Sequence, residues 1–203
     1  MNVRSAGIAL DDHHWLSILV EHGEDNQIPQ EIERIMTPDL FWIPGPRRGR
    51  LAIAARPRGG DWLEDEFSGL RRAGVDVIVS LLEEDEAAQL DLADEAKAAE
   101  ANGLRFISFP IPDRGIPAST PAAVSLVANI GGALEEGKNV AVPCRQGIGR
   151  SGLIAAGVLM TSGLSPEQAI QVVSTARGIT VPETSEQRSW AQQLPAPLPV
   201  GRR

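Results

Sequence analysis

The 203-residue sequence is poor in cysteine and histidine. It contains one cysteine, Cys144, and three histidines, all within the first 22 positions and far from Cys144 in sequence. A single cysteine excludes a disulfide framework, and this distribution offers no residues at the spacing of metal ligands. We therefore predict a protein without disulfides, without a metal site and without a bound cofactor.

The sequence also lacks a long apolar segment and an excess of basic residues. No run of 18 apolar residues occurs, and the N-terminus does not combine a basic start with an apolar core, so neither a membrane span nor a secretory signal is predicted. The formal net charge of −8 at pH 7 argues against nucleic acid or a membrane surface as a partner, because both attract a basic face. We expect a soluble, cytoplasmic protein whose oligomeric state the sequence does not indicate.

Composition divides the chain into three parts. Residues 1–37 carry seven acidic groups against two arginines and are predicted to form an acidic N-terminal extension. Residues 195–203, with the sequence PAPLPVGRR, are predicted to form a flexible tail. Residues 38–194 lie between them, and a hydrophobic content of 42% over the chain suffices for one core, so we predict one folded domain there.

Within this domain, short apolar runs alternate with helical patterns. The predicted strands are 41–43, 51–54, 75–82, 104–109 and 139–142, and the predicted helices are 61–73, 91–102, 121–134, 153–160 and 165–176. This alternation predicts an α/β fold with a central, mostly parallel sheet flanked by helices. Asp61 is expected to cap its helix, and Ser165 with Gln168 to form a capping box. Glu83, Glu84 and Glu86 form an acidic run that we expect in a solvated loop.

The most informative segment is Pro143–Gly152, with the sequence PCRQGIGRSG. It follows a predicted buried strand, precedes an apolar helix, and holds Cys144 six positions before Arg150. In this order, the loop amides and the helix N-terminus converge on one point, where they bind an anion and favour an ionised thiolate. The predicted phosphate-binding residues are Arg145, Gln146, Gly147, Ile148, Gly149 and Arg150. The alternative is a buried structural cysteine in a turn.

The order Cys, five residues, Arg, Ser resembles the signature of the cysteine-based protein phosphatases, which Ser151 completes. A second segment, PIPDRGIP at 110–117, is similar to the acid loop of the dual-specificity branch, which includes kinase-associated and related bacterial phosphatases. The resemblance implies that Cys144 is the nucleophile, Arg150 the phosphate binder and Asp113 the general acid and base. It also implies that the Ser151 hydroxyl stabilises the departing sulfur. Residues 38–194 would then be a phosphatase catalytic domain, with the cysteine loop between a central strand and a helix.

Two of the candidate residues also have a purely structural interpretation. Pro112 and Asp113 form a dipeptide that often makes a tight turn, although a carboxylic acid there can also protonate a leaving oxygen. Gln187 lies where part of the resembled family positions the hydrolytic water. Thr184 and Gln187 also fit a capping box, which is the interpretation that we favour.

One position departs from the family pattern. The residue before the nucleophile is usually histidine and here is Pro143, which has no N–H to donate and a fixed φ. We predict a protein-tyrosine or dual-specificity phosphatase that acts through a phosphocysteine on phosphorylated proteins or small phosphomonoesters. The sequence contains no tyrosine, so the Tyr-lined loop of the large tyrosine-specific enzymes is missing and a shallow, permissive pocket is expected. Two alternatives stay open. One is a phospho-binding module that is catalytically impaired because Pro143 replaces the usual histidine, and the other is a rhodanese-type sulfurtransferase.

Overall fold

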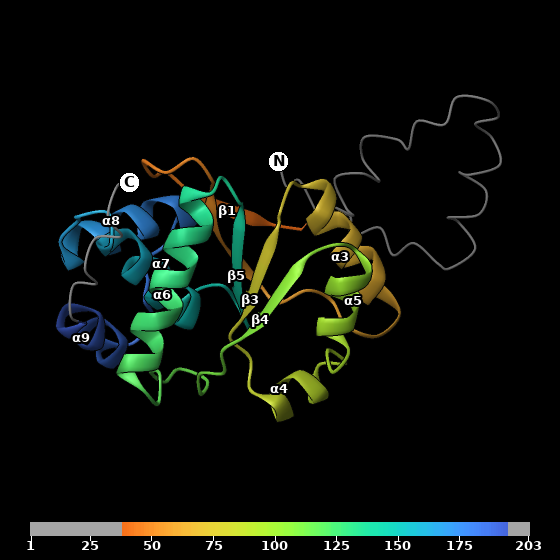
Figure 1. Ribbon diagram of the computed structural model, residues 1–203. Coiled ribbons are helices and arrows are strands. Elements are labelled where there is room, and N and C mark those ends of the chain that lie inside the picture. The colour runs from red at the N-terminus through yellow and green to blue at the C-terminus, as the bar shows by residue number, and fades with distance from the viewer. Residues whose placement is uncertain (1–37, 195–203) are drawn as a thin grey trace, which may run out of the picture. The chain divides into compact units, whose positions relative to one another are not determined.

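Residues 38–194 are described by the structure, a computed structural model, and they build a five-stranded sheet with helices on both faces (Figure 1). The predicted N-terminal extension and tail lie outside the described residues. The strands are β1 (Leu40–Ile43), β2 (Leu51–Ala55), β3 (Val77–Ser80), β4 (Arg105–Ser108) and β5 (Val140–Cys144). The helices are the 3-10 turn η1 (Gly60–Trp62), α3 (Leu63–Arg72), α4 (Glu84–Gln89), α5 (Glu95–Ala101), α6 (Thr120–Glu135), α7 (Gly149–Met160), α8 (Pro166–Arg177) and α9 (Ser185–Gln193).

The sheet has the strand order β1-β2-β5-β3-β4, and only β1 runs antiparallel to its neighbour. This arrangement confirms the predicted α/β fold with a central, mostly parallel sheet. β5 lies in the middle, between β2 and β3, and its last residue is Cys144. Ligands of open α/β sheets bind beyond the carboxyl ends of such central strands, so the topology places the predicted nucleophile at the expected edge.

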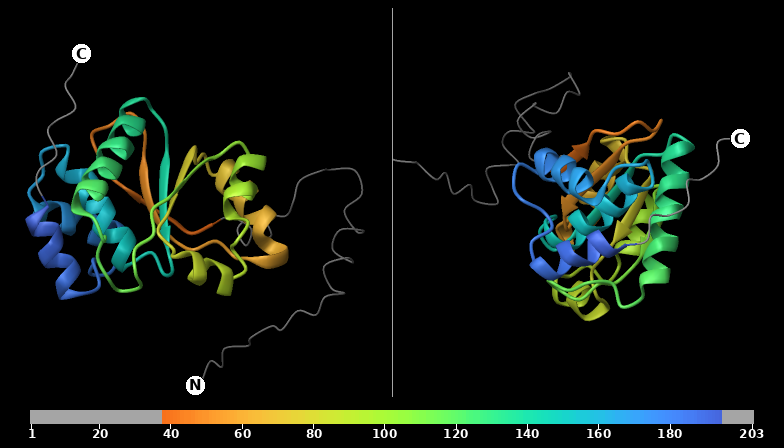
Figure 2. Two further views of the ribbon diagram at one scale, coloured as in Figure 1. Left: turned by 60° about the horizontal axis from the view of Figure 1, so that its bottom comes forward. Right: turned by 90° about the vertical axis from the view of Figure 1, so that its left-hand side faces the viewer.

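Strand residues alternate between two apolar cores, because successive side chains point to opposite faces of a sheet. Ile53 and Val142 face the larger core, which α6, α7 and α8 complete, whereas Ile78 and Ala141 face the smaller core under α3 and α5. Figures 1 and 2 show these two groups of helices on opposite sides of the sheet. Every residue of α7 is buried, which confirms the central buried helix predicted after the cysteine loop.

Two helix starts differ from the prediction. Asp61 belongs to the 3-10 turn η1, and the cap residue of α3 is Trp62, which makes no side-chain cap hydrogen bond. The helix predicted over 91–102 begins only at Glu95, since Asp91 has a left-handed φ of 56° that a helix does not allow. Asp91 instead accepts a backbone hydrogen bond from Gly60 through its carbonyl. Gly60 and Asp91 are distant in sequence, so sequence periodicity does not predict their contact.

Both predicted capping boxes are present. The Ser165 hydroxyl accepts from the Gln168 N–H while the Gln168 side chain accepts from the Ser165 N–H, and Thr184 and Gln187 repeat this exchange at α9. These reciprocal bonds satisfy amides that a helix start leaves unpaired. None of the helices in residues 38–194 is long and apolar enough to cross a membrane.

Candidate active site

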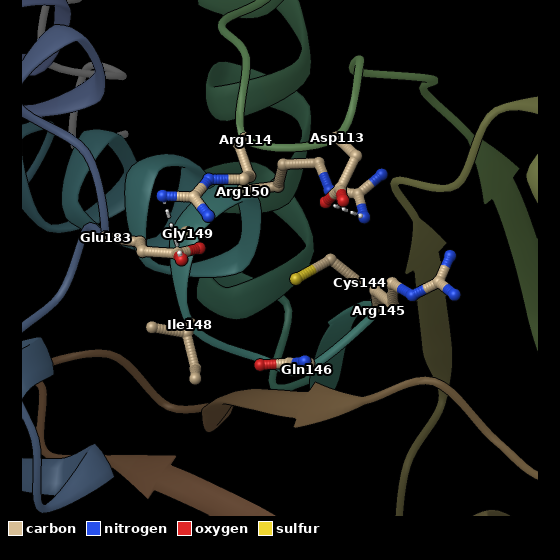
Figure 3. A pocket seen from close by; sticks show the side chains of 9 residues that line it. All are labelled: Asp113, Arg114, Cys144, Arg145, Gln146, Ile148, Gly149, Arg150 and Glu183. Atoms are coloured by element: carbon tan, nitrogen blue, oxygen red, sulfur yellow. Dashed lines mark hydrogen bonds and ion pairs between the residues drawn. The ribbon is translucent and has the colours of Figure 1, made fainter.

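The cysteine loop runs from the end of β5 to the start of α7, as the sequence predicts. Cys144 is 3% exposed, and its sulfur points into a cavity of about 150 Å³ at the carboxyl edge of the sheet (Figure 3). The lining residues are Asp113, Arg114, Cys144, Arg145, Gln146, Ile148, Gly149, Arg150 and Glu183. Asp113 and Cys144, which are distant in sequence, therefore share one cavity with the loop between β5 and α7.

Pro143 lies in the central strand without disrupting it. The pairing of β5 with β2 continues to Cys144, whereas its regular pairing with β3 ends at Ala141. The Pro143 carbonyl still accepts a hydrogen bond of 3.2 Å from the Leu81 N–H. Pro143 has no N–H with which to continue the pairing with β3, and that pairing ends two residues before it.

Arg150 is 2% exposed, and its guanidinium is held by several acceptors. Nη1 and Nη2 donate to the two carboxylate oxygens of Glu86 at 2.6 and 2.9 Å, which is a bidentate pair. Nη1 also donates to the Ile111 carbonyl at 3.0 Å, and Nη2 donates to Oδ1 of Asp113 at 3.0 Å. The guanidinium thus joins the predicted acid loop to the predicted phosphate loop.

Glu86 is a site residue that sequence reasoning missed. The expected solvated loop is wrong at this position, because residues 84–89 form α4 and Glu86 is 7% exposed. Hydrogen bonds from Arg150 hold the pKa of Glu86 below its usual value against the opposing effect of burial, and Arg145 contributes a further hydrogen bond. Burial would by itself lower the pKa of Arg150, but Glu86 and the charges of Cys144 and Asp113 raise it. Arg150 therefore remains a cation although it is buried.

Asp113 lies at the tip of a tight turn, so the structural interpretation of the Pro-Asp pair is confirmed, while its role as an acid stays a prediction. The Gly115 N–H donates to the Pro112 carbonyl at 2.8 Å, and Arg114 takes a left-handed φ of 59° inside the turn. This turn directs Asp113 toward the cavity, where its side chain is 56% exposed apart from the contact with Arg150. An exposed carboxyl at the mouth of an anion site can exchange a proton with a bound molecule or with water.

Three predicted residues contribute no side chain to the cavity lining. Ser151 is fully buried, and its hydroxyl has no hydrogen-bond partner within residues 38–194. Gly147 has a φ of 64°, and a Cβ there would stand 2.5 Å from the Ala54 carbonyl of β2. A Cβ on Gly149 would meet Oε1 of Gln187 at 2.9 Å. A Cβ at Gly147 would therefore clash with backbone, and one at Gly149 would displace the buried side chain of Gln187.

Gln187 is fully buried and is not among the residues that line the cavity. Its Oε1 accepts from the Thr184 N–H at 3.2 Å, and its Nε2 donates to the Gly115 carbonyl at 2.8 Å. The capping-box interpretation is confirmed, and the second bond ties α9 to the acid loop. A role of Gln187 in positioning water stays a prediction.

Comparisons with known proteins indicate a phosphatase family. A family model described as polymorphic toxin system, DSP-PTPase phosphatase, matches residues 52–164. The chain is 27% identical over 161 residues to a putative tyrosine phosphatase, 197R, of Invertebrate iridescent virus 6. That alignment covers 76% of this chain and 56% of the viral protein, so this chain spans little more than half of that relative.

Two solved structures extend the comparison. Tk-PTP in its active form is 30% identical with a TM-score of 0.65, and the match covers 77% of this chain and 96% of that one. A kinase-associated phosphatase, with its catalytic-site cysteine replaced by serine, is 19% identical with a TM-score of 0.70, covering 77% and 93% of the two chains. The second likeness concerns the fold alone. Because the family model matches more than half of the chain, including both the acid loop and the cysteine loop, the chain belongs to the DSP-PTPase phosphatases, within the cysteine-based dual-specificity class.

Proposed function

We propose that residues 38–194 are the catalytic domain of a phosphomonoester hydrolase that works through a phosphocysteine. Its substrates are phosphorylated tyrosine, serine or threonine side chains of proteins, or small phosphomonoesters. The observation that supports this proposal most directly is that the buried Cys144, the buried Arg150 and the exposed carboxylate of Asp113 line one cavity. These are the nucleophile, the phosphoryl binder and the proton donor that the reaction needs.

In the first step, the Cys144 thiolate attacks phosphorus, an S–P bond forms and the bond from phosphorus to the leaving oxygen breaks. Asp113, protonated in this step, gives its proton to that oxygen, so an alcohol or phenol departs instead of an alkoxide or phenoxide. The loop amides and Arg150 bind the non-bridging oxygens, whose charge grows in the transition state. The guanidinium of Arg150 is held in place by its ion pair with Glu86.

In the second step, the Asp113 carboxylate takes a proton from water, and the resulting oxygen attacks phosphorus. The S–P bond breaks, and inorganic phosphate and the Cys144 thiolate are released. The Ser151 hydroxyl is well suited to stabilise the departing sulfur, because it is buried and has no other hydrogen-bond partner within residues 38–194. Each proton given up in the first step is thus recovered in the second.

The hydrogen bond from Arg150 to Asp113 has to break during this cycle and be replaced by one to the substrate. Nη2 of Arg150 donates to both Glu86 and Asp113, so its donors are fully used. A phosphoryl oxygen that enters the cavity takes the donor that Asp113 holds and frees the carboxyl for the leaving oxygen. Substrate binding and the placement of the acid are therefore coupled.

The cavity lining favours this function over the alternatives. A sulfurtransferase has no use for a carboxyl group at the cavity mouth, where Asp113 lies. Pro143 leaves the pairing of the Cys144 strand with β2 intact, and the presence of Asp113 at the cavity supports turnover over binding alone. The lining contains no aromatic side chain, and Ile148 is its one large apolar residue, which supports a permissive pocket.

The test is phosphate release from an aryl phosphate and from a panel of phosphopeptides, with EDTA present throughout. We expect turnover by the native chain, none by Cys144→Ser, and for Asp113→Asn a loss that is greatest with poor leaving groups. Tight tungstate binding without phosphate release would instead identify a binding module, and thiocyanate formation from thiosulfate a sulfurtransferase. A comparison with Pro143→His measures what the replaced histidine contributes.

A further inference from the structure

Arg177, the last residue of α8, contacts the phosphate loop from outside the cavity. Its Nε donates to the Gly147 carbonyl at 3.1 Å, and its Nη2 donates to the Gln146 carbonyl at 3.3 Å. The central carbon of the guanidinium lies 4.0 Å from the centre of the Phe41 ring on β1. One side chain thus bridges two successive peptide groups of the loop while it stacks on the edge strand of the sheet.

The direction of these bonds determines where the following amides point. A trans peptide is planar, and its N–H points away from its C=O. With the carbonyls of Gln146 and Gly147 turned toward Arg177, the N–H groups of Gly147 and Ile148 are turned to the other side of the loop. Gln146 and Ile148 line the cavity and Arg177 does not, so that other side is the cavity.

We infer that Arg177 is a positioning residue that holds two loop amides in the orientation that binds the phosphoryl oxygens. The inference rests on the proposed function, because an amide pair needs this orientation only if an oxyanion occupies the cavity. Peptide groups beside a glycine rotate easily, and Gly147 already has a positive φ. The two bonds from Arg177 resist that rotation on one side, while contact with the backbone of β2 confines Gly147 on another.

Phe41 explains why this residue has to be an arginine. A flat guanidinium can stack on an aromatic ring and still direct two parallel donors at neighbouring carbonyls. A lysine ammonium is a single point of charge on a flexible stem and cannot satisfy both carbonyls in the same way. We therefore expect Arg177→Lys to restore little of what Arg177→Ala loses, and Phe41→Leu to have a smaller effect of the same kind.

The experiment measures tungstate binding by calorimetry for the native chain and for these three variants. Arg71→Gln is the matched control. Arg71, on α3, also donates to a backbone carbonyl, that of Val75 at 3.0 Å, but it does not contact the cysteine loop. We expect the tungstate Kd of Arg177→Ala to rise on the order of tenfold. This effect is smaller than the loss in kcat of about a hundredfold or more that follows removal of a direct oxyanion donor. The KM for an aryl phosphate should rise in parallel. Arg71→Gln should bind tungstate like the native chain.

Native affinity for tungstate in Arg177→Ala would overturn the inference. If that variant does not fold, native affinity in Arg177→Lys overturns it equally. A weakening of binding that Arg71→Gln shows to the same degree would reveal a general effect of stability and also overturn it. If the native chain binds tungstate but releases no phosphate, the proposed function fails while the role of Arg177 is still decided by these affinities. Absence of tungstate binding by the native chain overturns both.

Discussion

Glu95, at the start of α5, is a carboxyl group that the fold buries without adequate compensation. It is 8% exposed, its Oε1 accepts one hydrogen bond of 2.7 Å from the Ser80 hydroxyl, and its Oε2 has no partner within residues 38–194. Burial raises the pKa of Glu95 from 4.5 to about 7, and the bond from Ser80 opposes this only in part. The folded protein therefore binds a proton at Glu95 more tightly than the unfolded chain does.

This difference makes stability depend on pH in a defined direction. Below about pH 4.5 both states are protonated at Glu95, and its contribution to the free energy of unfolding is fully present. As pH rises to about 7, the unfolded chain loses this proton first, so that contribution is lost, and above that pH it stays constant. A pKa raised from 4.5 to about 7 corresponds to about 3 kcal/mol.

Glu95→Gln removes the titration and keeps the shape of the side chain. We expect the free energy of unfolding of this variant, relative to the native chain, to increase by about 3 kcal/mol between pH 4.5 and pH 8. Urea unfolding at several pH values measures this difference, and any constant cost of burying the amide cancels between the two ends. Glu100→Gln, which changes an exposed residue of the same helix, is the control. A difference between Glu95→Gln and the native chain that does not vary with pH would refute the reasoning.

Three further predictions concern the site. Glu86→Gln should lower the free energy of unfolding by about 3 kcal/mol, because Arg150 keeps its charge and loses its buried partner; urea unfolding measures this, and a loss below 1 kcal/mol would contradict it. Asp113→Asn should bind tungstate more tightly than the native chain, because the carboxylate no longer competes for Arg150; calorimetry showing weaker binding would count against this competition. Arg114→Gly should be more stable than Arg114→Ala by about 1 kcal/mol in urea unfolding, since glycine adopts φ of 59° without strain, and equal stabilities would contradict that account.

Sequence patterns identified the parts of this molecule whose chemistry is local. The cysteine loop is one continuous segment between a strand and a helix, so spacing alone indicates which amides converge. The capping boxes at Ser165 and Thr184 were predictable for the same reason, because each depends on residues three positions apart. The turn around Asp91 was not, since its left-handed conformation depends on contact with a distant glycine, Gly60.

The residues that the sequence did not predict contact the cysteine loop or Arg150 from other helices. Glu86 was not distinguishable from Glu83 and Glu84, because its pairing with Arg150 spans 64 positions and exists only when β3 lies beside β5. Arg177 carried no signal either, since it recognises backbone carbonyls, which every sequence has.

Neither Glu86 nor Arg177 lines the cavity. Each contacts groups that do. Glu86 holds the guanidinium of Arg150 with two bonds, and Arg177 holds two peptide groups of the loop. A bound oxyanion requires donors that point at it before it arrives, because donors that must first rotate cost free energy in each turnover. The predicted phosphate site therefore depends on a cation and an anion outside the signature motif. Substitutions at these two positions should impair oxyanion binding although every residue of the motif is retained.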